Sequence, residues 1–321
     1  MAAEPVSEPT LPLEVEELLS WLSAERGRSA NTLAAYRRDL RAYCRWLAAQ
    51  AVALDEVQEQ HITAYIAHLR DLGRAASSVA RALVAVRALH RFLAEEGHHS
   101  GDPAADVEVP RVPQGLPKAL SEQEVERLLA AVTGDEPFAL RDRAILEMLY
   151  GTGVRISELV GLSLGDLDLE GGLVRVFGKG AKERIVPLGR FARAALGAWL
   201  GPGGREQLVP ERWARRTDAD AVFLNQRGGR LSRQGAWGIV RRYGLAAGLG
   251  DRLTPHVLRH SCATHMLDHG ADIRAVQELL GHASVSTTQV YTLVSTERLR
   301  AVYESAHPRA RARSRDYPCR P

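Results

Sequence analysis

Cysteine is scarce in this sequence of 321 residues: its three copies lie far apart and form neither a C-x-x-C pattern nor a disulfide framework. Aromatic residues make up only 6% of the chain, so Leu, Ala and Val must build the hydrophobic cores. No apolar run approaches the ~20 residues that a transmembrane helix needs. The opening stretch, MAAEPVSEPT, lacks the basic and apolar regions of a secretory signal. Together these absences predict a cytoplasmic protein without disulfides and without a membrane partner.

The sequence also lacks a G-x-x-x-x-G-K-[ST] stretch, the phosphate-binding loop of many ATPases and GTPases. The segment GKGAK at 178–182 is too short for such a loop and is not followed by Ser or Thr. We therefore expect no P-loop ATPase. The composition, with 45% hydrophobic and 25% charged residues, is that of an ordinary globular protein, and the length allows two domains.

Apolar residues recur at steps of three and four from residue 13 to about residue 96, which predicts helices joined by short links. In NTLAAYRRDLRAYCRWLAAQ the apolar stripe consists of Leu33, Tyr36, Leu40, Tyr43 and Leu47. Asn31 is the expected N-cap of this helix, and Gly97 is the expected stop of the last one. We therefore expect a small helical N-terminal domain over residues 13–101.

Residues 102–118 contain four prolines, which break helices and favour an extended path, so we expect the domain linker here. Beyond it, Ser121 followed by Glu124 is a capping-box pattern that predicts a helix start. GGLVRVFGKGAKERIVPL alternates apolar and polar residues around a Gly-Lys-Gly turn, which predicts a β-hairpin, and AVFLN predicts a further short strand. The expected second domain, 119–308, is mostly α-helical with a small antiparallel sheet. A basic tail over 309–321 is expected to follow it.

Positive charge is concentrated in the N-terminal domain, although the net charge of the chain is only +3. Residues 26–45 carry six arginines against one acid, and residues 70–91 carry five more against one acid. A solvated helix face is one interpretation, but such faces usually mix Lys, Arg and Glu, and nearly pure Arg is typical of contacts to phosphates. No aromatic stacking pattern for single strands is evident, which favours a duplex. The candidate DNA-binding residues are Arg37, Arg38, Arg41, Arg45, Arg81 and Arg87.

The stretch LTPHVLRHSCATH holds three histidines and a cysteine, which raises the possibility of a metal site. His256 and His260 share a helix face, but the residues between them are Val, Leu and Arg rather than the acid of an H-E-x-x-H site. A guanidinium beside a divalent cation is unfavourable, so we expect no metal. Thr254 and Pro255 instead predict an N-cap and the first helical residue. His256 and Arg259 then meet at a helix start, which favours an anion such as phosphate.

Three further stretches carry residues of the same kind. YGTGVRISELVGL places Arg155 after a Gly-rich turn, VFGKGAKERIVPL places Lys179 at a hairpin tip, and LLGHASVSTTQVYTLV contains His282 and Tyr291. Taken in order with TPHVLRHSCATHML, these stretches resemble the tyrosine recombinase (phage-integrase) family, and most closely its bacterial Xer recombinases. SANTLAAYRRDL resembles the core-binding domain of that family. The resemblance covers residues 13–310, and the C-terminal part is slightly more similar to XerD-type than to XerC-type members.

The resemblance implies a fold and an activity. The fold would be a SAM-like helical core-binding domain followed by an α+β catalytic domain. The activity would be site-specific recombination, in which duplex DNA is cut and rejoined through a 3′-phosphotyrosine intermediate. The implied catalytic residues are Arg155, Lys179, His256, Arg259, His282 and Tyr291.

The residue types suit the roles that the resemblance implies. Tyr291 would attack the phosphate as the nucleophile, while Arg155 and Arg259 would clamp the non-bridging oxygens. Lys179 would protonate the leaving 5′ oxygen and His256 would act as the general base. His282 would add a hydrogen bond to the phosphate. No metal, ATP or other cofactor is expected, because the cationic side chains neutralise the phosphate.

The implied partners are a double-stranded DNA recombination site and a second Xer recombinase. Two such proteins would form a heterotetramer that resolves chromosome dimers at cell division, with the septal DNA translocase FtsK as a further partner. The remaining polar residues of the helix at 255–268 are then expected to pack or hydrogen-bond behind the site, namely His260, Cys262 and His265.

The segment FLNQRGGRLSRQGAW predicts a turn at Gly228–Gly229 and a helix capped by Ser232. Arg233 and Gln234 at its start suit guanine and adenine edges, although phosphate contacts fit them equally well. Three other functions stay open at this point: an integrase of a mobile element, a non-catalytic DNA-binding regulator and a topoisomerase. The regulator would be expected to lack Arg155, Arg259 or Tyr291, and all three are present.

Overall fold

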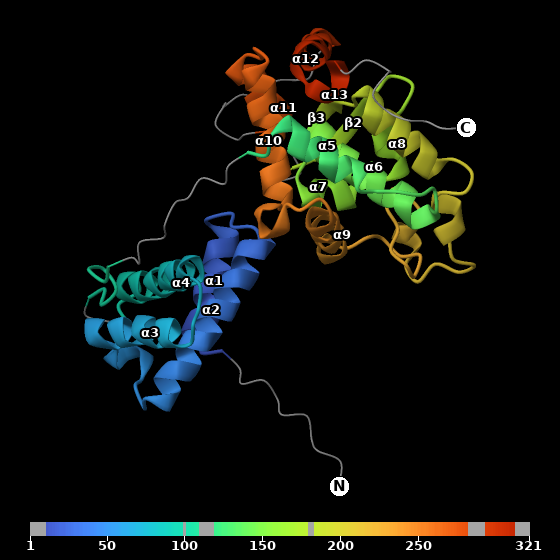
Figure 1. The fold of residues 1–321 in the computed structure, drawn as a ribbon. Coiled ribbons are helices and arrows are strands. Elements are labelled where there is room, and N and C mark those ends of the chain that lie inside the picture. The colour runs from blue at the N-terminus through green and yellow to red at the C-terminus, as the bar shows by residue number, and fades with distance from the viewer. Residues whose placement is uncertain (1–10, 99–100, 109–118, 179–182, 282–292, 312–321) are drawn as a thin grey trace. The chain divides into compact units, whose positions relative to one another are not determined.

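The computed structural model describes residues 11–98, 101–108, 119–178, 183–281 and 293–311 (Figure 1). The chain divides into two compact units, Met1–Gly115 and Leu116–Pro321. Each unit has a hydrophobic core of its own. Among the described helices, none is long and apolar enough to cross a membrane.

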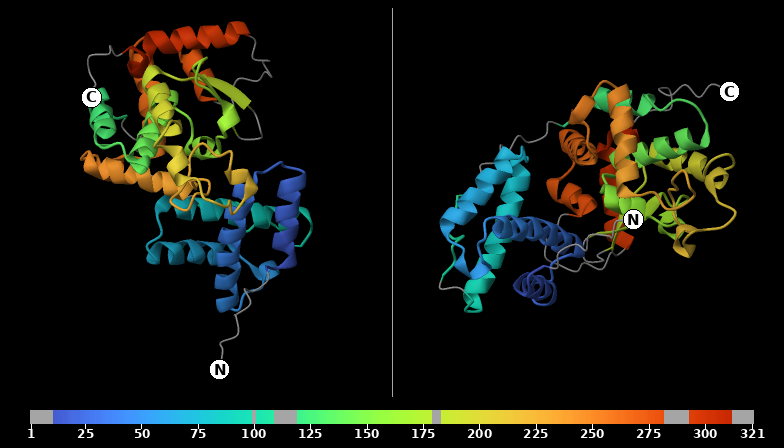
Figure 2. Two further views of the ribbon diagram at one scale, coloured as in Figure 1. Left: turned by 90° about the vertical axis from the view of Figure 1, so that its right-hand side faces the viewer. Right: turned by 90° about the horizontal axis from the view of Figure 1, so that it is seen from below.

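The first unit is a small bundle of helices. They are α1 (Leu13–Ala24), α2 (Ala30–Ala49), α3 (Glu59–Asp71) and α4 (Ala76–Glu95), with a 3-10 turn at Leu54–Glu56. Helices α2 and α4 pack against each other, both contact α1, and α3 contacts α4 (Figures 1 and 2). The predicted stripe of α2 faces the core, where Leu40, Tyr43 and Leu47 are buried. Gly97 lies just beyond α4 with a φ of 77°, as expected for a helix stop.

The N-cap of α2 differs from the prediction. Ser29, not Asn31, precedes the first helical residue, and its hydroxyl accepts a hydrogen bond of 3.3 Å from the Thr32 amide. Asn31 is the second residue of the helix. Both residue types cap helices well, so the choice between them depends on where the chain turns, which the apolar pattern of the helix interior does not specify.

The second unit is mostly helical with a small sheet. Its elements are α5 (Glu122–Ala130), α6 (Pro137–Thr152), α7 (Ile156–Gly161), β1 (Leu167–Asp168), β2 (Leu173–Phe177), β3 (Glu183–Pro187), α8 (Arg190–Leu200), α9 (Arg233–Ala246), α10 (Pro255–Asp268), α11 (Ile273–Leu280), α12 (Leu293–Ala306) and α13 (Pro308–Arg311). Helix α6 runs through the centre of the unit, where it contacts α8 and α10 (Figures 1 and 2). With the bundle of the first unit, this confirms the predicted fold class.

The sheet has the order β1-β2-β3 and is antiparallel throughout. Strands β2 and β3 form the predicted hairpin, in which Val174 pairs with Val186. The prediction of a strand at AVFLN is wrong, because Ala221 and Leu224 form only isolated β-bridges and do not join this sheet. Scattered backbone hydrogen bonds and side chains together satisfy the backbone there: the Val222 amide donates to the Leu162 carbonyl oxygen at 3.1 Å, and the Trp199 indole and the Arg205 guanidinium donate to the carbonyl oxygens of Val222 and Ala221, both at 2.9 Å. The third strand is β1.

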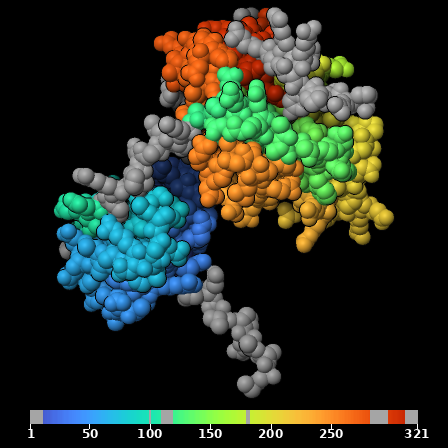
Figure 3. Space-filling model, viewed as in Figure 1, coloured from blue at the N-terminus to red at the C-terminus, as the bar shows by residue number. Residues whose placement is uncertain are grey.

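The start of α5 forms the predicted capping box: Ser121 accepts from the Glu124 amide at 3.2 Å, and the Glu124 carboxylate accepts from the Ser121 amide at 2.9 Å. Just before it, the Leu120 amide donates to the Ser261 hydroxyl in α10 at 2.9 Å. The green surface of α5 accordingly lies directly against the orange surface of the segment around α10 (Figure 3). These contacts anchor α5 to the helix that carries the H-x-x-R pair.

The C-terminal end of the described chain corrects one expectation. Arg309 was expected to begin a basic tail, but it is buried in α13, and its guanidinium pairs with the carboxylate of Glu147 in α6. A buried carboxylate requires a cationic partner, and Arg309 supplies it. Tyr303 of α12 makes a second link to α6, because its hydroxyl donates to the Gly151 carbonyl oxygen at 2.8 Å. The rest of the expected tail, 312–321, lies outside the described residues.

Candidate active site

Arg155 lies where α6 ends and α7 begins. Gly153, which follows the last residue of α6, adopts the left-handed conformation with a φ of 62°, and Arg155 is the N-cap of α7. This arrangement matches the predicted Gly-rich turn and helix start. The Glu158 carboxylate accepts hydrogen bonds of 2.8 Å from both the amide and the guanidinium of Arg155. The Arg155 side chain nevertheless keeps 37% of its surface exposed, so part of the guanidinium remains accessible.

Arg259 lies in α10, whose N-terminus is built as predicted. The Thr254 hydroxyl accepts from the Val257 amide at 3.2 Å, and Pro255 is the first helical residue. Arg259 itself is buried, with 8% of its surface exposed. Its guanidinium donates to the carbonyl oxygens of Gly153 at 2.6 Å and Leu280 at 2.5 Å. Two backbone acceptors therefore fix its direction.

A third guanidinium, that of Arg184 in β3, lies beside these two. It makes a bidentate ion pair with Glu158, with both N–O distances at 2.8 Å. Its remaining Nε–H group donates to the Leu279 carbonyl oxygen at 3.0 Å. The side chain is 5% exposed and that of Glu158 is 3% exposed, so this pair is almost fully shielded from water.

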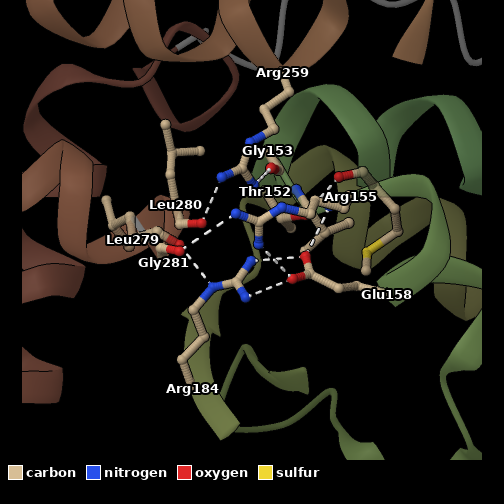
Figure 4. Close-up of polar contacts among 11 residues, drawn as sticks. Thr152, Gly153, Arg155, Glu158, Arg184, Arg259, Leu279, Leu280 and Gly281 are labelled. Atoms are coloured by element: carbon tan, nitrogen blue, oxygen red, sulfur yellow. Dashed lines mark hydrogen bonds and ion pairs between the residues drawn. The ribbon is translucent and has the colours of Figure 1, made fainter. Parts of the chain in front are cut away.

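The three arginines converge on the C-terminal end of α11 (Figure 4). Arg184 donates to the carbonyl oxygen of Leu279, Arg259 to that of Leu280, and Arg155 to that of Gly281 at 3.3 Å. The last carbonyl groups of a helix lack partners within the helix and carry the negative end of its dipole. They therefore stabilise three cations that would otherwise repel one another.

Burial and neighbouring charges shift the pKa values of two groups. Burial lowers the pKa of Arg259 to about 10, and the charges of Arg155 and Arg184 act in the same direction. Burial alone would raise the pKa of Glu158, but hydrogen bonds and charge from Arg184, with the hydrogen bonds from Arg155, lower it overall. At neutral pH Arg259 is thus cationic and Glu158 is anionic. Three guanidinium groups against one carboxylate leave an excess of positive charge, which suits an anionic ligand.

The histidines of α10 fall into two groups. His256 and His260, four residues apart, are both exposed to solvent. His265 is buried, and its ring lies between the Tyr150 hydroxyl at 2.9 Å and the Leu120 carbonyl oxygen at 2.7 Å. The expectation that these residues pack behind the site is met by His265, but it is wrong for His260, which faces solvent. Cys262 is buried, and burial raises its pKa to about 12, which makes the thiol inert at neutral pH.

Three of the sequence-predicted catalytic residues lie outside the described residues: Lys179, His282 and Tyr291. The structure therefore brings together Arg155 and Arg259 and places His256 one helical turn before Arg259 on α10. Across the described ranges, 11–98, 101–108, 119–178, 183–281 and 293–311, no group of three or more His, Cys, Asp or Glu side chains could hold a metal ion.

The candidate DNA-binding arginines of the first unit have different surroundings. Arg38 and Arg45 are exposed on α2, while Arg41 is half-buried. Two others pair with acids: Arg37 makes a bidentate contact with Glu16, and Arg81 makes one with Asp39 at 2.8 and 3.0 Å. Arg87 differs from the expectation, because its guanidinium donates to the carbonyl oxygens of Ala104, at 3.2 Å, and Val107. It therefore holds the segment after α4, which occupies donors that a DNA phosphate would otherwise use.

The helix predicted to carry Arg233 and Gln234 toward the DNA is α9. Ser232 caps it by accepting from the Gly235 amide at 3.0 Å, and the predicted turn before it contains Gly228 with a φ of 75°. Arg233 and Gln234 are exposed in the first turn of this helix. Exposed side chains at a helix N-terminus are well placed for contacts with a nucleic acid.

Sequence reasoning missed Glu158 and Arg184. For Glu158 a signal was present, because an acid three residues after a helix N-cap is half of a capping box. Arg184 gave a weaker signal: in a strand it shares a face with Val186, and a charged residue on the buried face of a strand needs a partner. Neither signal identifies which residue supplies that partner.

Comparison with known proteins agrees with this geometry. The model of the phage integrase family matches residues 118–298, and that of the phage integrase N-terminal SAM-like domain matches residues 15–97. The tyrosine recombinase XerD of Mycobacterium tuberculosis strain H37Rv is 49% identical over 314 residues, covering 94% of this chain and 99% of the relative. That of Halalkalibacterium halodurans is 45% identical over 303 residues, with the same coverage.

Solved structures of lower identity share the fold. A lambda integrase (75-356) dimer bound to a COC′ core site is similar with a TM-score of 0.66 at 22% identity, covering 84% of this chain and 94% of that one. The XerH site-specific recombinase bound to palindromic difH substrate gives a TM-score of 0.64 at 22% identity, with 90% and 84% covered. From the family models and the XerD relatives together, the chain belongs to the phage integrase family and is a site-specific recombinase of the XerD type.

Proposed function

We propose that this protein cuts and rejoins duplex DNA through a 3′-phosphotyrosine bond formed by Tyr291. The observation that carries the proposal is the convergence of Arg155 and Arg259 at the end of α11, from two elements that are far apart in the sequence. Two guanidinium groups so placed can bind the two non-bridging oxygens of one phosphodiester. They stabilise the charge that develops on those oxygens as the nucleophile attacks.

The other proposed roles complete the reaction. The Tyr291 phenol attacks phosphorus and loses its proton, for which His256 is the proposed base, and the 5′ oxygen leaves with a proton from Lys179. His282 donates a hydrogen bond to the phosphate. The exposure of His256 is consistent with its role, since a base must reach a substrate that arrives from solvent. Because the phosphotyrosine keeps the energy of the broken ester, reversal of these steps rejoins the DNA without ATP.

The proposed substrate is a double-stranded DNA recombination site, bound in the cytoplasm. Side chains of α2, of α4 and of the start of α9 would contact it, namely Arg37, Arg38, Arg41, Arg45, Arg81, Arg233 and Gln234. In the biological reaction, a heterotetramer with a second Xer recombinase would resolve chromosome dimers at cell division, with FtsK as a further partner. The XerD relatives support this role, because they match nearly their whole length to this chain. On this proposal the helical domain over 13–101 and the catalytic domain from 119 onward act as the two DNA-binding parts.

A nicked suicide duplex tests the nucleophile. Candidate recombination sites from the organism's own genome are nicked so that cleavage releases a short fragment and traps the covalent complex. We expect the wild-type protein to form an adduct that survives a denaturing gel. Tyr291→Phe should bind the same duplex with unchanged affinity in a gel shift and should form no adduct, because it lacks the attacking oxygen.

Tyr243→Phe is the matched control. Its hydroxyl donates to the Asp142 carboxylate at 3.3 Å on the α6–α9 side of the unit, so its loss should leave adduct formation intact. A covalent adduct formed by Tyr291→Phe at the wild-type rate would show that another residue attacks the phosphate.

Chelation tests the mode of charge neutralisation. If the arginines and Lys179 neutralise the phosphate, cleavage of the suicide duplex should proceed at the same rate in excess EDTA. The measurement is the rate of adduct formation with and without the chelator, at equal ionic strength because DNA binding depends on salt. Loss of activity in EDTA that added zinc restores would contradict this mechanism.

A further inference from the structure

We propose that Arg184 is a positioning residue for the recombination reaction: it neutralises Glu158 so that Arg155 remains free to bind the scissile phosphate. The inference rests on the proposed cleavage chemistry and adds to it a residue that does not touch the DNA. Arg184 is 5% exposed, and both of its terminal nitrogens are paired with the Glu158 carboxylate. The terminal nitrogens of Arg259 donate instead to neutral carbonyl groups, which leave its charge available, so we assign the phosphate to Arg259 and Arg155 and not to Arg184.

The charge of Glu158 is the reason that a second arginine is needed. Its carboxylate accepts four hydrogen bonds, two from Arg155 and two from Arg184. Only the Arg184 pair is bidentate between side chains, and that pair is the more deeply buried. In a shielded setting a bidentate guanidinium–carboxylate contact largely cancels the charge of the acid. With Arg184 present, Glu158 still orients Arg155 through hydrogen bonds, but the charge of the carboxylate is balanced by Arg184. The positive charge of Arg155 therefore remains available to attract the DNA phosphate.

Arg184 also joins three parts of the site. Its own strand, β3, follows the hairpin tip that carries Lys179; Glu158 belongs to the helix that begins at Arg155; and Leu279 lies next but one to Gly281, after which the chain continues into His282. One guanidinium thus connects the elements that precede or follow three predicted catalytic residues. A Cβ atom at Gly281 would lie 3.1 Å from the Arg184 side chain, which shows how closely the two segments meet.

The first experiment measures stability without DNA. Arg184→Met keeps the length of the side chain but leaves the buried Glu158 with one cation, so the melting temperature should fall. Adding Glu158→Gln removes the uncompensated charge, and the double variant should melt at a higher temperature than Arg184→Met alone. A double variant that melts below Arg184→Met would overturn the charge pairing.

The second experiment separates positioning from folding. Each protein is tested, at a temperature where it is fully folded, on the suicide duplex and on the same duplex with a neutral methylphosphonate at the scissile position. We expect Arg184→Met to slow adduct formation on the phosphate by about 100-fold, as for a misplaced catalytic group. The slowing on the methylphosphonate should be much smaller, because a neutral centre demands less positive charge. Equal slowing on both duplexes would overturn the proposal, whereas wild-type cleavage of the phosphate duplex tests the proposed function separately.

Two variants sharpen the comparison. Arg309→Met breaks a second buried Arg–Glu pair among the described residues of the unit, that with Glu147, and should lower the melting temperature while leaving the ratio of the two cleavage rates at the wild-type value. Arg184→Lys keeps the charge but loses the bidentate geometry, so its rate on the phosphate should lie between those of the wild type and Arg184→Met. If Arg309→Met and Arg184→Met had the same ratio of cleavage rates on the phosphate and methylphosphonate duplexes, the role of Arg184 would be purely structural.

Discussion

Gly153 meets two requirements at one position. Its φ of 62° turns the chain from α6 toward Arg155, and its carbonyl oxygen accepts from Arg259. A Cβ atom there would lie 2.6 Å from a methyl carbon of Leu280 and 3.2 Å from the sulfur of Cys262. Only glycine fits both the backbone conformation and the available space.

Replacement of this glycine is therefore costly. Gly153→Ala should lower the free energy of unfolding by roughly 2 kcal/mol or more, from the left-handed conformation together with crowding. It should also slow cleavage, because displacing the Gly153 carbonyl group displaces Arg259. Urea unfolding and the suicide duplex measure the two effects.

Gly248→Ala is the matched control. Gly248 has a similar φ of 71°, but apart from its chain neighbours no atom lies within 4 Å of its Cβ position, so only the conformational cost of about 1 kcal/mol should remain. Equal losses in the free energy of unfolding for Gly153→Ala and Gly248→Ala would show that Leu280 and Cys262 leave enough space for a Cβ atom at Gly153.

At the scale of elements, the caps of α5, α9 and α10 and the hairpin were predictable, whereas the cap of α2 and the ion-pair network were not. The capping box of α5, the cap of α10 and the pairing of β2 with β3 follow from local sequence, because each depends on residues close together in the chain. The Arg184–Glu158 pair joins residues 26 positions apart, and the Arg259–Gly153 contact joins residues 106 apart. No local pattern encodes such partners. The family resemblance found Arg155 and Arg259, but it did not indicate what holds them.

The cap of α10 gives a prediction at this scale. Thr254→Ala should cost about 1 kcal/mol of stability, because the Val257 amide loses its acceptor. It should also slow cleavage, since His256 is in the uncapped turn. Ser121→Ala at the cap of α5 should cost a similar amount and leave the cleavage rate of the folded protein unchanged. Equal cleavage rates for Thr254→Ala and Ser121→Ala would show that the cap of α10 does not contribute to cleavage.

The exposed face of α2 gives a second prediction at the scale of elements. Arg38 and Arg45 are seven residues apart on this helix, and both are exposed. If each contacts a DNA phosphate, each substitution by Ala should reduce the slope of log K against log salt concentration by about 0.9. Titrations at several salt concentrations measure the slope. Arg193→Ala, an exposed arginine of α8, should leave it unchanged, and a wild-type slope for both α2 variants would remove them from the interface.

At the scale of the whole molecule, the second unit depends on its C-terminal segment. His307, between α12 and α13, is buried, with its ring stacked on Tyr303 at a centroid distance of 4.8 Å and packed against Tyr150. Burial lowers the pKa of His307 to about 3, and electrostatic interactions with His265, Arg309 and His269 act in the same direction. The folded state therefore holds this histidine neutral.

This burial makes the unit sensitive to acid. In the unfolded chain His307 takes up a proton as the pH falls below about 6.5, whereas in the folded chain it does so only near pH 3. Over that interval the unfolded state binds more protons, so stability should decrease with falling pH, by at most about 1.4 kcal/mol per pH unit from this group. Melting temperatures from pH 7 to pH 4 measure the loss.

His307→Gln should show a shallower decrease of the melting temperature with falling pH, although its melting temperature at pH 7 should be below that of the wild type. His260→Gln, on the exposed face of α10, should keep the wild-type dependence on pH. An unchanged dependence in His307→Gln would contradict the role of this histidine.

The end of α11 has a consequence for how such a site can vary through evolution. Its three acceptors are main-chain carbonyl groups of Leu279, Leu280 and Gly281, so the arginines recognise the path of the backbone and not the identity of the first two side chains. Mutations that exchange one apolar residue for another at positions 279 and 280 can accumulate without altering the acceptors. An insertion or deletion of a single residue within α11 would rotate all three carbonyl groups by about 100° and misdirect every arginine together. We therefore expect the length of this helix to be more strictly constrained than its composition.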